Sequence, residues 1–452
     1  MDFIDAFKGI QKIEEENDIW SLMVGDAYVW AIIRLRIYET LISPLYKKSL
    51  LGLIFFRIRQ YRLRDVLVSY VQLRKRTAAR AVAFSQPNAR QRYRNTYYDL
   101  WFDPLAEAQK DFVIFEWPSP NPHFRNNSTS KPRLRYLDYL SVKVDILGFI
   151  WSRLRRIDIQ IRQTILPGKI MERIISEEVS RYQLFEKEYQ RFFRKNPSIR
   201  TVYMRVACNP RHIALIVAAR KQGIKTIELQ HGYNAKYNLD YEYRKKLEKT
   251  QDSWPFPDEF HVYTEKIRHE VLRNPNCIYG SGNLMVFNFW KQLKDRFASI
   301  PQRETFDRAS INEDGRKKHR ILISSQDIKS SELIAWVERL LKIKEIQEKY
   351  LIIYKLHPRE IHNLGAYDCL RARSGCIVVG NEVSIYELFN ITDIHSSITS
   401  SSVYDAYFWG IPNIIFKTKD SEIFSDIKNE KGVYFASDEP EYISLLHKLV
   451  ER

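Results

Sequence analysis

The chain has 452 residues, of which 44% are hydrophobic, 13% aromatic and 28% charged. That length suits two domains rather than one core, and the composition excludes a disordered chain. The four cysteines show no CxxC pair and no metal-ligand spacing, which is typical of scattered thiols in a reducing compartment.

The N-terminal 18 residues are acidic and lack the basic flank, apolar run and cleavage site of a signal peptide. The most apolar stretch, Leu50 to Phe56, is far shorter than the roughly 20 residues that span a bilayer. We therefore expect a cytoplasmic protein that sits at most peripherally at the inner face of the cell membrane.

The formal net charge of +17 is unevenly distributed. Between Arg34 and Arg94 there are fifteen Lys or Arg residues against two acids, a balance that attracts polyanions such as anionic lipid or phosphate-bearing substrates. Apolar residues between Leu50 and Tyr61 intermix with the arginines, which favours a helix on a membrane surface. The charges do not segregate to one helical face, so a solvated helix packed on the domain remains the alternative.

Residues 1–110 are predicted to be a helical, basic N-terminal region, with helices from Trp20 to Leu41 and from Tyr61 to Val82. The apolar run Phe112–Glu116 predicts a buried strand, and the Pro-, Asn- and Ser-rich stretch after it predicts a long loop. Further helices are expected over Ile150–Gln163 and Ile170–Phe193.

Residues 111–301 are predicted to form the first, acceptor-binding α/β domain. Its clearest unit is a strand at Thr201–Val206, a helix that begins at Asn209-Pro210 and ends at Gly223, and a strand at Lys225–Leu229. This order is typical of a right-handed βαβ crossover in a parallel sheet. The alternation continues with a strand at Phe260–Tyr263, a helix at Glu265–Arg273 and a strand at Ile278–Tyr279.

The polar residues 302–318 are predicted to be a linker, and residues 319–452 a second, nucleotide-donor domain. Its expected strands are Arg320–Ser324, Leu351–Lys355, Ile377–Val379, Asp393–His395, Asn413–Phe416 and Val433–Phe435, with a last helix at Glu439–Leu449. The fold class is therefore α/β, with two doubly wound Rossmann-like domains that face each other across a cleft.

His357 follows an apolar strand, at the end where open α/β sheets bind ligands. Pro358 fixes the next turn, and Lys355 adds a positive charge nearby. An imidazole in this position can donate a hydrogen bond to a phosphate oxygen. A purely structural turn histidine is the alternative.

Ser400, Ser401 and Ser402 belong to a run of hydroxyl residues between a predicted strand and a predicted helix. Unpaired N–H groups and the helix dipole make such a helix start an anion site, and hydroxyls add donors. A helix cap needs one serine, so the run exceeds structural need and favours phosphate binding.

His231 also follows a strand, and is our candidate for a general base toward an acceptor hydroxyl. Glu228, Gln230, Gly232 and Asn234 surround it in sequence and are candidates for acceptor binding; ordering of the interdomain cleft is the structural alternative. Gly282, in a Gly-Ser-Gly-Asn turn, either contacts the donor phosphate or is simply a turn.

The sequence contains no Walker A loop, GxSxG elbow, HExxH or DxD motif. We therefore expect no metal ion and no cofactor, with a nucleotide-sugar as co-substrate.

The order of His231-Gly232, His357-Pro358 and the serine run resembles bacterial surface-polysaccharide glycosyltransferases of the GT-B type. Asp405-Ala406, followed by Gly410 and Pro412, looks like the EAxxxGxP segment of those enzymes, with Asp in place of Glu. In that family the acid binds the donor ribose, so the resemblance implies a ribose-binding role for Asp405.

The HP motif and the serines are also similar to those of sialyl- and Kdo-type transferases, in which they hold the phosphate of a CMP-sugar. The acidic base motif of that group is absent, and His231 stands at the comparable place. The HG and HP pair resembles CDP-glycerol-type transferases as well.

The resemblance implies transfer of a sugar, such as Kdo or sialic acid from CMP, to a surface polysaccharide or lipid-linked glycan acceptor. CDP-polyol phosphotransfer and nucleotide-sugar 2-epimerisation are the enzymatic alternatives. A basic lipid- or nucleic-acid-binding module is the non-enzymatic one, but no nucleic-acid motif accompanies the charge.

Overall fold

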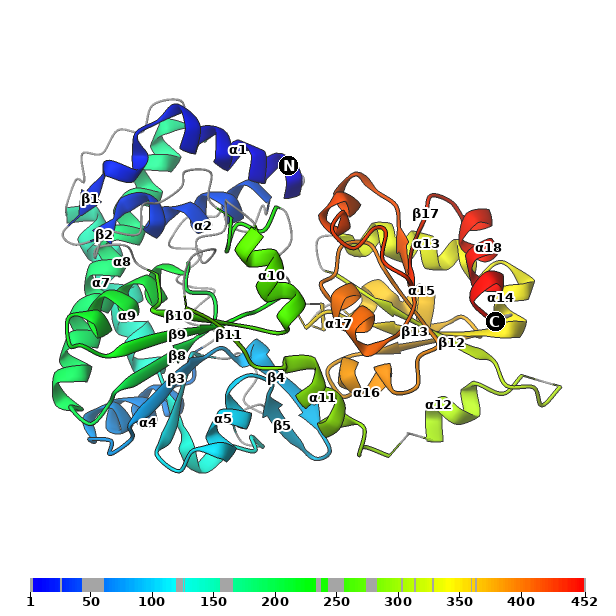
Figure 1. Cartoon of the computed structure of the whole chain (residues 1–452), viewed down its shortest axis with the longest axis horizontal. Coiled ribbons are helices and arrows are strands. Elements are labelled where there is room, and N and C mark those ends of the chain that lie inside the picture. Colours follow the sequence, from blue (N-terminus) through cyan, green and yellow to red (C-terminus); the bar gives the residue numbers. More distant parts are fainter. Residues whose placement is uncertain are drawn as a thin grey trace. The chain divides into compact units, whose positions relative to one another are not determined.

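The computed structural model describes residues 3–24, 27–42, 61–118, 125, 127–154, 166–232, 237–242, 256–273, 283–301, 304–312, 314–326, 329–358, 360–361 and 364–450 (Figure 1). The chain divides into two compact units. Unit 1 comprises Met1–Arg90 and Thr96–Phe287, and unit 2 comprises Gln91–Asn95 and Asn288–Arg452. The change of unit at Asn288 precedes the predicted linker at 302–318, which contains a helix, α12 (Glu304–Ala309).

Unit 1 is built on a parallel sheet, seven-stranded in the described residues, with the order β11-β10-β9-β8-β3-β6-β7. Its strands are β3 (Ala81–Ser85), β6 (Phe112–Glu116), β7 (Leu134–Tyr136), β8 (Thr201–Met204), β9 (Lys225–Leu229), β10 (Glu259–Val262) and β11 (Asn283–Val286). Starting from β3, the chain winds outward to β7 and then returns to β8, which is the Rossmann order.

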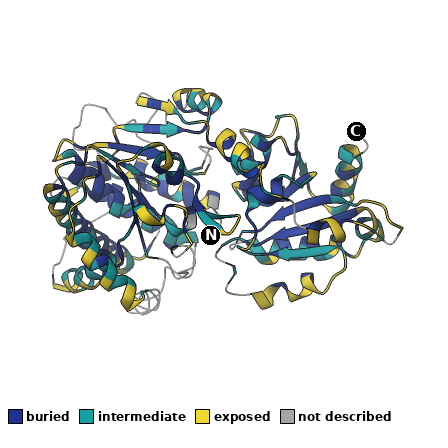
Figure 2. Cartoon of the chain, turned by 90° about the horizontal axis from the view of Figure 1, so that it is seen from below, coloured by how far each residue is buried: buried dark blue, intermediate teal, exposed yellow. Residues whose placement is uncertain are grey.

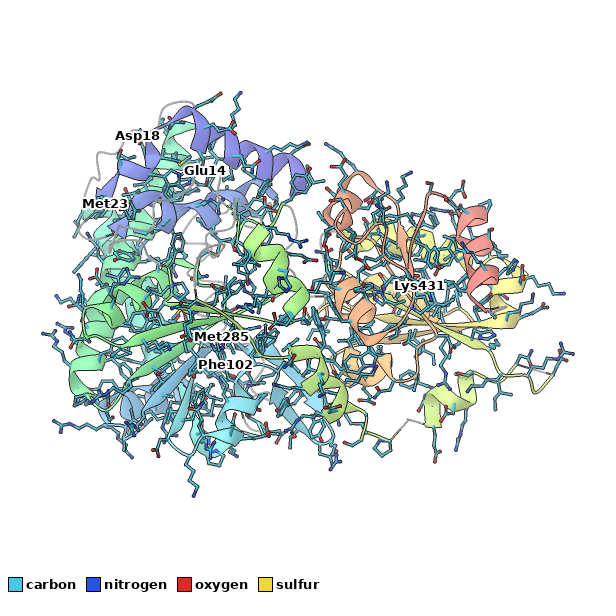
Figure 3. All side chains as sticks on the ribbon, in the orientation of Figure 1. Glu14, Asp18, Met23, Phe102, Met285 and Lys431 are labelled. Carbon is cyan, nitrogen blue, oxygen red and sulfur yellow. The ribbon has the colours of Figure 1, made fainter. Side chains whose placement is uncertain are left out.

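The helices of unit 1 cover the two faces of this sheet. They are α1 (Phe3–Glu16), α2 (Val29–Ile42), α4 (Leu63–Arg74), α5 (Phe102–Ala108), α7 (Asp138–Leu154), α8 (Gly168–Lys195), α9 (Pro210–Arg220) and α10 (Glu265–Arg273). Val82 and Phe84 of β3 pack with α7, α8 and α9 on one face. Ala81 and Ala83 pack with Phe102 of α5 (labelled in Figure 3) on the other, because successive strand residues point to opposite faces.

Two predictions for the N-terminal region were wrong. The helix predicted from Tyr61 to Val82 ends at Arg74, and Ala81 and Val82 instead begin β3, a central strand of the sheet. The helix predicted from Trp20 to Leu41 is a 3-10 turn at Ile19–Ser21, the strand pair β1 (Met23–Val24) and β2 (Ala27–Tyr28), and then α2. The region belongs to the first domain, as predicted, but it also contributes the central strand β3 to the sheet.

Part of the N-terminal positive charge is structural rather than superficial. Arg34 is buried, and its Nε donates to Glu14 Oε1 at 2.6 Å. Its other nitrogens donate to the carbonyls of Leu239 and Glu242. Arg90 is likewise buried and pairs with Glu116 at the end of β6.

Unit 2 contains a parallel sheet, six-stranded in the described residues, with the order β14-β13-β12-β15-β16-β17. Its strands are β12 (His319–Ser324), β13 (Tyr350–Lys355), β14 (Cys376–Val379), β15 (Ile394–Ser397), β16 (Asn413–Phe416) and β17 (Val433–Ala436). The order is again that of a Rossmann domain. Figure 2 shows these central strands mostly in the colour of buried residues.

Helices flank this sheet: α11 (Phe289–Phe297), α12, α13 (Ser330–Leu340), α14 (Lys344–Lys349), α15 (Asp368–Arg371), α16 (Ile385–Phe389), α17 (Ser402–Trp409) and α18 (Glu439–Val450). All six strands predicted for the second domain are confirmed within two residues at each end. The predicted class, α/β with two doubly wound Rossmann-like domains, is confirmed by the two strand orders.

Some predictions fall outside the described residues, namely the strand at Ile278–Tyr279 and most of the stretch from Leu50 to Tyr61. A two-stranded sheet of β4 (Arg90–Tyr93) and β5 (Thr96–Asp99) lies between β3 and α5 in sequence. Within the described ranges, no helix has the length and apolarity that crossing a bilayer requires.

Candidate functional site

The strand order of unit 2 reverses between β12 and β15, and ligands of open α/β sheets bind at such a switch point. The carboxyl ends of both strands carry hydroxyl residues: Ser324 and Ser325 end β12, and Ser397 ends β15. The Ser397 hydroxyl donates to the Ser324 carbonyl at 2.8 Å, which holds the two strand ends together. The loops that carry His357 and the predicted serines follow β13 and β15, the two strands that flank β12 in the sheet.

Glu360, which the sequence analysis did not single out, organises the loop after β13. It is buried, and one carboxylate oxygen accepts from the backbone N–H of His357 at 2.7 Å. The other oxygen accepts from the Ser325 hydroxyl at 2.8 Å and from the Tyr367 hydroxyl at 2.7 Å. One carboxylate therefore fixes the end of β13 to the end of β12.

His357 is half-buried and lies in this loop, directly before Pro358 in the turn. Its carbonyl also accepts the N–H of Glu360 at 2.9 Å, so backbone and side chain close a tight turn around it. The structure thus places His357 two residues after the carboxyl end of β13, and its role in ligand binding stays a prediction.

Lys355, which was predicted to bind the donor phosphate together with His357, contacts backbone carbonyls instead. Its ammonium group is buried and donates to the carbonyls of Leu356 and Gly380, the latter at 2.8 Å. Burial lowers the pKa of Lys355 to about 8, partly offset by Glu382 and Glu360. Its contacts tie β13 to the end of β14, so a phosphate contact by Lys355 is not what this structure shows.

The serine run divides into structural and accessible members. The Ser396 hydroxyl bonds to the Tyr442 hydroxyl, and Thr399 donates to Gln326. Ser402, at the first position of α17, is buried. Ser401 is exposed and makes no side-chain cap bond, and Ser400 is half-buried.

His395, a second residue that the sequence analysis did not single out, is buried and contacts Ser402 of this run. Burial lowers its pKa to about 4, so the ring is neutral at physiological pH. Nδ1 lies 2.6 Å from Asn413 Oδ1, a carbonyl oxygen that can only accept, so Nδ1 carries the proton. Nε2 therefore accepts, and the Ser324 hydroxyl donates to it at 2.8 Å.

The Ser402 hydroxyl connects His395 to Ser400: its oxygen lies 3.3 Å from Nε2 of His395, which accepts from Ser324 at the shorter distance of 2.8 Å. Ser402 donates its hydroxyl to Ser400 Oγ at 2.8 Å, and the Ser402 backbone N–H contacts the same oxygen at 3.3 Å. Ser400 Oγ is thus an acceptor twice, and in the described part of the chain no acceptor is recorded for its own hydrogen. At the start of α17, that hydroxyl is a donor available to an anion.

Asp405 lies on α17, one turn after the serines, and its carboxylate has partners inside unit 2. Trp290 Nε1 donates to Oδ1 at 2.7 Å, and the Tyr386 hydroxyl lies 3.4 Å from Oδ2. The Trp290 ring also stacks on Phe408, with centroids 3.7 Å apart. Burial raises the pKa of Asp405 to about 6, against these two hydrogen bonds, which lower it. A ribose would have to share this carboxylate with Trp290.

In unit 1, His231 is held at the end of β9 by three neighbours. The Val206 N–H donates to Nδ1 at 3.3 Å, so the proton is on Nε2, which donates to Asp240 Oδ2 at 2.8 Å. The Tyr241 hydroxyl also contacts Nδ1 at 2.9 Å. Burial would raise the pKa of Asp240, but the hydrogen bond and charge of His231 hold it below its ordinary value.

This arrangement is an Asp–His pair in which the carboxylate orients the ring and can stabilise an imidazolium. The Nδ1 lone pair, which a general base would use, already accepts from Val206 and Tyr241. Proton abstraction by His231 therefore requires the Tyr241 hydroxyl to turn away from the ring.

The backbone beside His231 is strained. Val206 has φ of 56°, a region that β-branched residues rarely adopt. Its carbonyl contacts Nδ1 of buried His212 at 3.0 Å, and burial lowers the pKa of His212 to about 3. Strain of this kind persists where surrounding contacts enforce it, and such positions cluster at functional sites.

The predicted acceptor residues have other roles in the structure. Glu228 is buried and accepts the Ala207 N–H at 3.0 Å. Gln230 is buried, accepts the Tyr263 N–H and donates to the Gly232 carbonyl. Both shape the His231 loop rather than reach solvent. Gly232 has φ of 65°, the left-handed turn that favours glycine.

Asn234 and Gly282 lie outside the described residues, and Asn283, which follows Gly282, begins β11. Among the residues described, no group of three or more His, Cys, Asp and Glu side chains is placed to hold a metal ion.

No family model and no curated protein matches the sequence. Among solved structures, the chain is similar to UDP-GlcNAc 2-epimerase from Methanocaldococcus jannaschii in complex with UDP-GlcNAc and UDP (TM-score 0.47, 11% identity, 82% of this chain and 92% of that one). It is also similar to Acinetobacter baumannii MurG (TM-score 0.43, 11% identity, 82% of this chain and 91% of that one). A glycosyltransferase from Rickettsia africae is similar as well (TM-score 0.43, 11% identity, 82% of this chain and 88% of that one). The fold of this chain rests on its own strand orders.

We predict that Glu360→Gln will loosen the loop after β13. A glutamine has one acceptor oxygen, so it cannot serve the His357 N–H and the hydroxyls of Ser325 and Tyr367 together. An unmatched buried polar group costs about 1–3 kcal/mol, so the urea midpoint should fall accordingly. Glu348→Gln, on the exposed side of α14, is the control and should not move it. An unchanged midpoint for Glu360→Gln would show that the clamp is dispensable.

We predict that Asp405→Asn will change how stability depends on pH. Burial raises the folded-state pKa from 3.8 to about 6, so the folded wild type binds the proton more tightly than the unfolded chain does. Its stability therefore falls as pH rises from about 4 to about 6, and the asparagine variant lacks this fall. The gain in melting temperature of Asp405→Asn over wild type should grow between pH 4 and pH 7. Exposed Asp368→Asn should show no such trend, and a flat difference for Asp405→Asn would refute the raised pKa.

Proposed function

We propose that the protein is a glycosyltransferase whose unit 2 binds a nucleotide-activated sugar through its phosphate at the β12/β15 switch point. The observation that carries this proposal is the convergence, at one edge of a Rossmann sheet, of the Glu360-held His357 loop and the α17 start with the Ser400 donor. Backbone N–H groups, a hydroxyl and an imidazole are the donors that suit a phosphate.

In the proposed reaction an acceptor hydroxyl oxygen bonds to the anomeric carbon of the sugar. The bond between that carbon and the phosphate oxygen breaks, and the nucleotide leaves with the electron pair. His357 and Ser400 stabilise the charge that develops on the leaving phosphate; one such donor is worth about 3 kcal/mol in other enzymes. His231 is our candidate for the group that takes the acceptor proton.

A CMP-activated sugar is the donor that the HP and serine motifs favour, and a surface polysaccharide or lipid-linked glycan is the acceptor that we propose. A thermal-shift screen with CMP, CDP, UDP and GDP therefore comes first, because a nucleotide that binds the native state raises the melting temperature.

We predict that His357→Ala will reduce sugar transfer by about 100-fold while the melting temperature stays near wild type, since the loop is fixed by backbone contacts of residue 357. His319→Ala is the matched control, because His319 begins β12 at the opposite end of the same sheet and its side chain is 43% exposed. Near wild-type transfer by His357→Ala would remove His357 from the mechanism.

The products of the same assay separate the alternatives. Phosphorus carried into the glycan would establish phosphopolyol transfer instead. Consumption of the nucleotide-sugar with no acceptor present would establish an epimerase.

We predict that Asp240→Asn will lower turnover by about 100-fold and leave nucleotide affinity unchanged, because an amide cannot stabilise the imidazolium that His231 becomes on taking a proton. Glu265→Gln, an exposed carboxylate of α10, is the control within unit 1. A fall in kcat that is accompanied by a clear fall in melting temperature would mean that the role of Asp240 is structural. An unchanged kcat would exclude a mechanism in which Asp240 stabilises His231 as the base.

A further inference from the structure

Two helices of unit 1 each expose three apolar side chains at every fourth position. On α4 these are Leu63, Leu67 and Val71, and on α7 they are Ile146, Ile150 and Leu154, all between 43% and 77% exposed. A spacing of four residues places each trio along one side of its helix. We call these six residues the α4/α7 face.

The two helices lie against each other. The rings of Tyr70 and Tyr139 are 4.9 Å apart, and the Tyr61 hydroxyl lies 2.8 Å from both Ser141 Oγ and Asp145 Oδ2. The Ser69 hydroxyl donates to the Tyr136 carbonyl, just before α7. Exposed apolar residues so concentrated on neighbouring elements mark an interaction surface rather than the scatter that any soluble protein shows.

The exposed charge around this face has a single sign. Every acid of the two helices is engaged on the protein side: Asp65 and Asp138 pair with Arg125, and Asp145 pairs with Arg181. The exposed charged residues on and beside the helices are instead cationic: Arg62, Arg64, Arg74, Lys75, Arg76 and Arg153. This combination of apolar stripes and cations is complementary to an anionic bilayer.

Behind α4 and α7 lies a cavity of about 260 Å³, near the lower limit of small-ligand pockets. Its apolar lining comes from α4, α7, α8 and the sheet: Tyr70, Leu73, Phe84, Phe115, Leu140 and Phe192. Tyr189 also lines it, with its ring edge-on to Phe84 at a centroid distance of 5.6 Å.

The rim of the cavity is basic. Arg74, Lys143, Arg191 and Lys195 line it together with one acid, Glu188. Lys143 and Arg191 both pair with Glu188, and Arg74 lies over the Tyr70 ring at 4.4 Å. Four cations around one carboxylate leave a net positive rim, which suits a phosphate attached to an apolar chain.

We propose that the α4/α7 face docks on an anionic membrane and that the cavity takes an aliphatic chain of an anionic phospholipid, with the lipid phosphate at the basic rim. The apolar stripes enter the headgroup boundary, and the exposed arginines contact neighbouring lipid phosphates. Helix α4 lies inside the basic stretch Arg34–Arg94 for which the sequence analysis predicted lipid contact, and α7 is added to it here.

Membrane docking is tested by co-sedimentation of the whole chain with vesicles. We expect phosphatidylcholine vesicles containing phosphatidylglycerol to bind at least tenfold more tightly than phosphatidylcholine alone, with loss of the difference at high salt. Replacing Leu67 and Ile150 together by Glu should abolish binding without changing the melting temperature, since both are exposed. Leu272→Glu, equally exposed on α10, is the control and should bind as wild type. Wild-type binding by the double variant, or no preference for anionic vesicles, would overturn the proposal.

Chain capture is tested with monomeric dioctanoyl-phosphatidylglycerol, with inorganic phosphate and a neutral octyl detergent as separate arms. We expect only the phospholipid to raise the melting temperature. Arg74→Gln, which should fold as wild type because Arg74 is exposed, should weaken that shift at least threefold by removing a rim cation. An equal shift from phosphate alone, or an unaffected shift in Arg74→Gln, would show that the cavity does not hold the lipid. Nucleotide binding by unit 2 gives an independent readout, so failure of this proposal leaves the transferase proposal intact.

Discussion

The constraint on which the structure depends is that all strands of a parallel sheet end at one edge. In unit 2 the strand order reverses between β12 and β15, so two consecutive crossovers go to opposite faces and leave the ends of these strands uncovered. Residues that are far apart in sequence, such as Ser325, Glu360 and Ser397, meet there because of this topology. Any chemistry of unit 2 that requires converging donors is restricted to this edge.

Burial decides which of the polar groups at that edge are available to a ligand. The carboxylate of Glu360 and the imidazole of His395 are satisfied inside the protein, and they fix the loops that carry His357 and Ser400. A buried network whose members all have partners is rigid, so the accessible donors keep their positions before a ligand arrives. In unit 1 the contacts of His231 with Asp240 and Tyr241 also fix the ring, but the Tyr241 hydroxyl lies at Nδ1, the nitrogen that the proposed reaction would need.

Periodicity in the sequence was sufficient to predict the strands of unit 2, because each apolar run is bounded by polar or glycine residues. It missed β3, since Ala81–Ser85 follows a long basic stretch with no turn residue that would end the preceding helix. The motif histidines His231 and His357 could be found from their positions after strands. Glu360, His395 and Asp240 could not, because their importance lies in contacts made by folding. The sequence could not predict the contacts of Lys355, because a lysine at a strand end can turn either toward a ligand or, as here, toward the carbonyl of Gly380.

The same distinction applies to net charge. The fifteen cations between Arg34 and Arg94 look equivalent in the sequence, but Arg34 and Arg90 are buried beside Glu14 and Glu116 and hold elements of unit 1 together. Exposed cations beside α4, such as Arg62 and Arg76, are what remain to act on a partner. Their attraction for an anionic surface is screened within about 10 Å at 0.1 M salt. The donors at the β12/β15 edge act over hydrogen-bond distances, so their interaction with a phosphate is much less sensitive to salt. Ionic strength therefore separates the two anion-binding roles that we propose for unit 1 and unit 2.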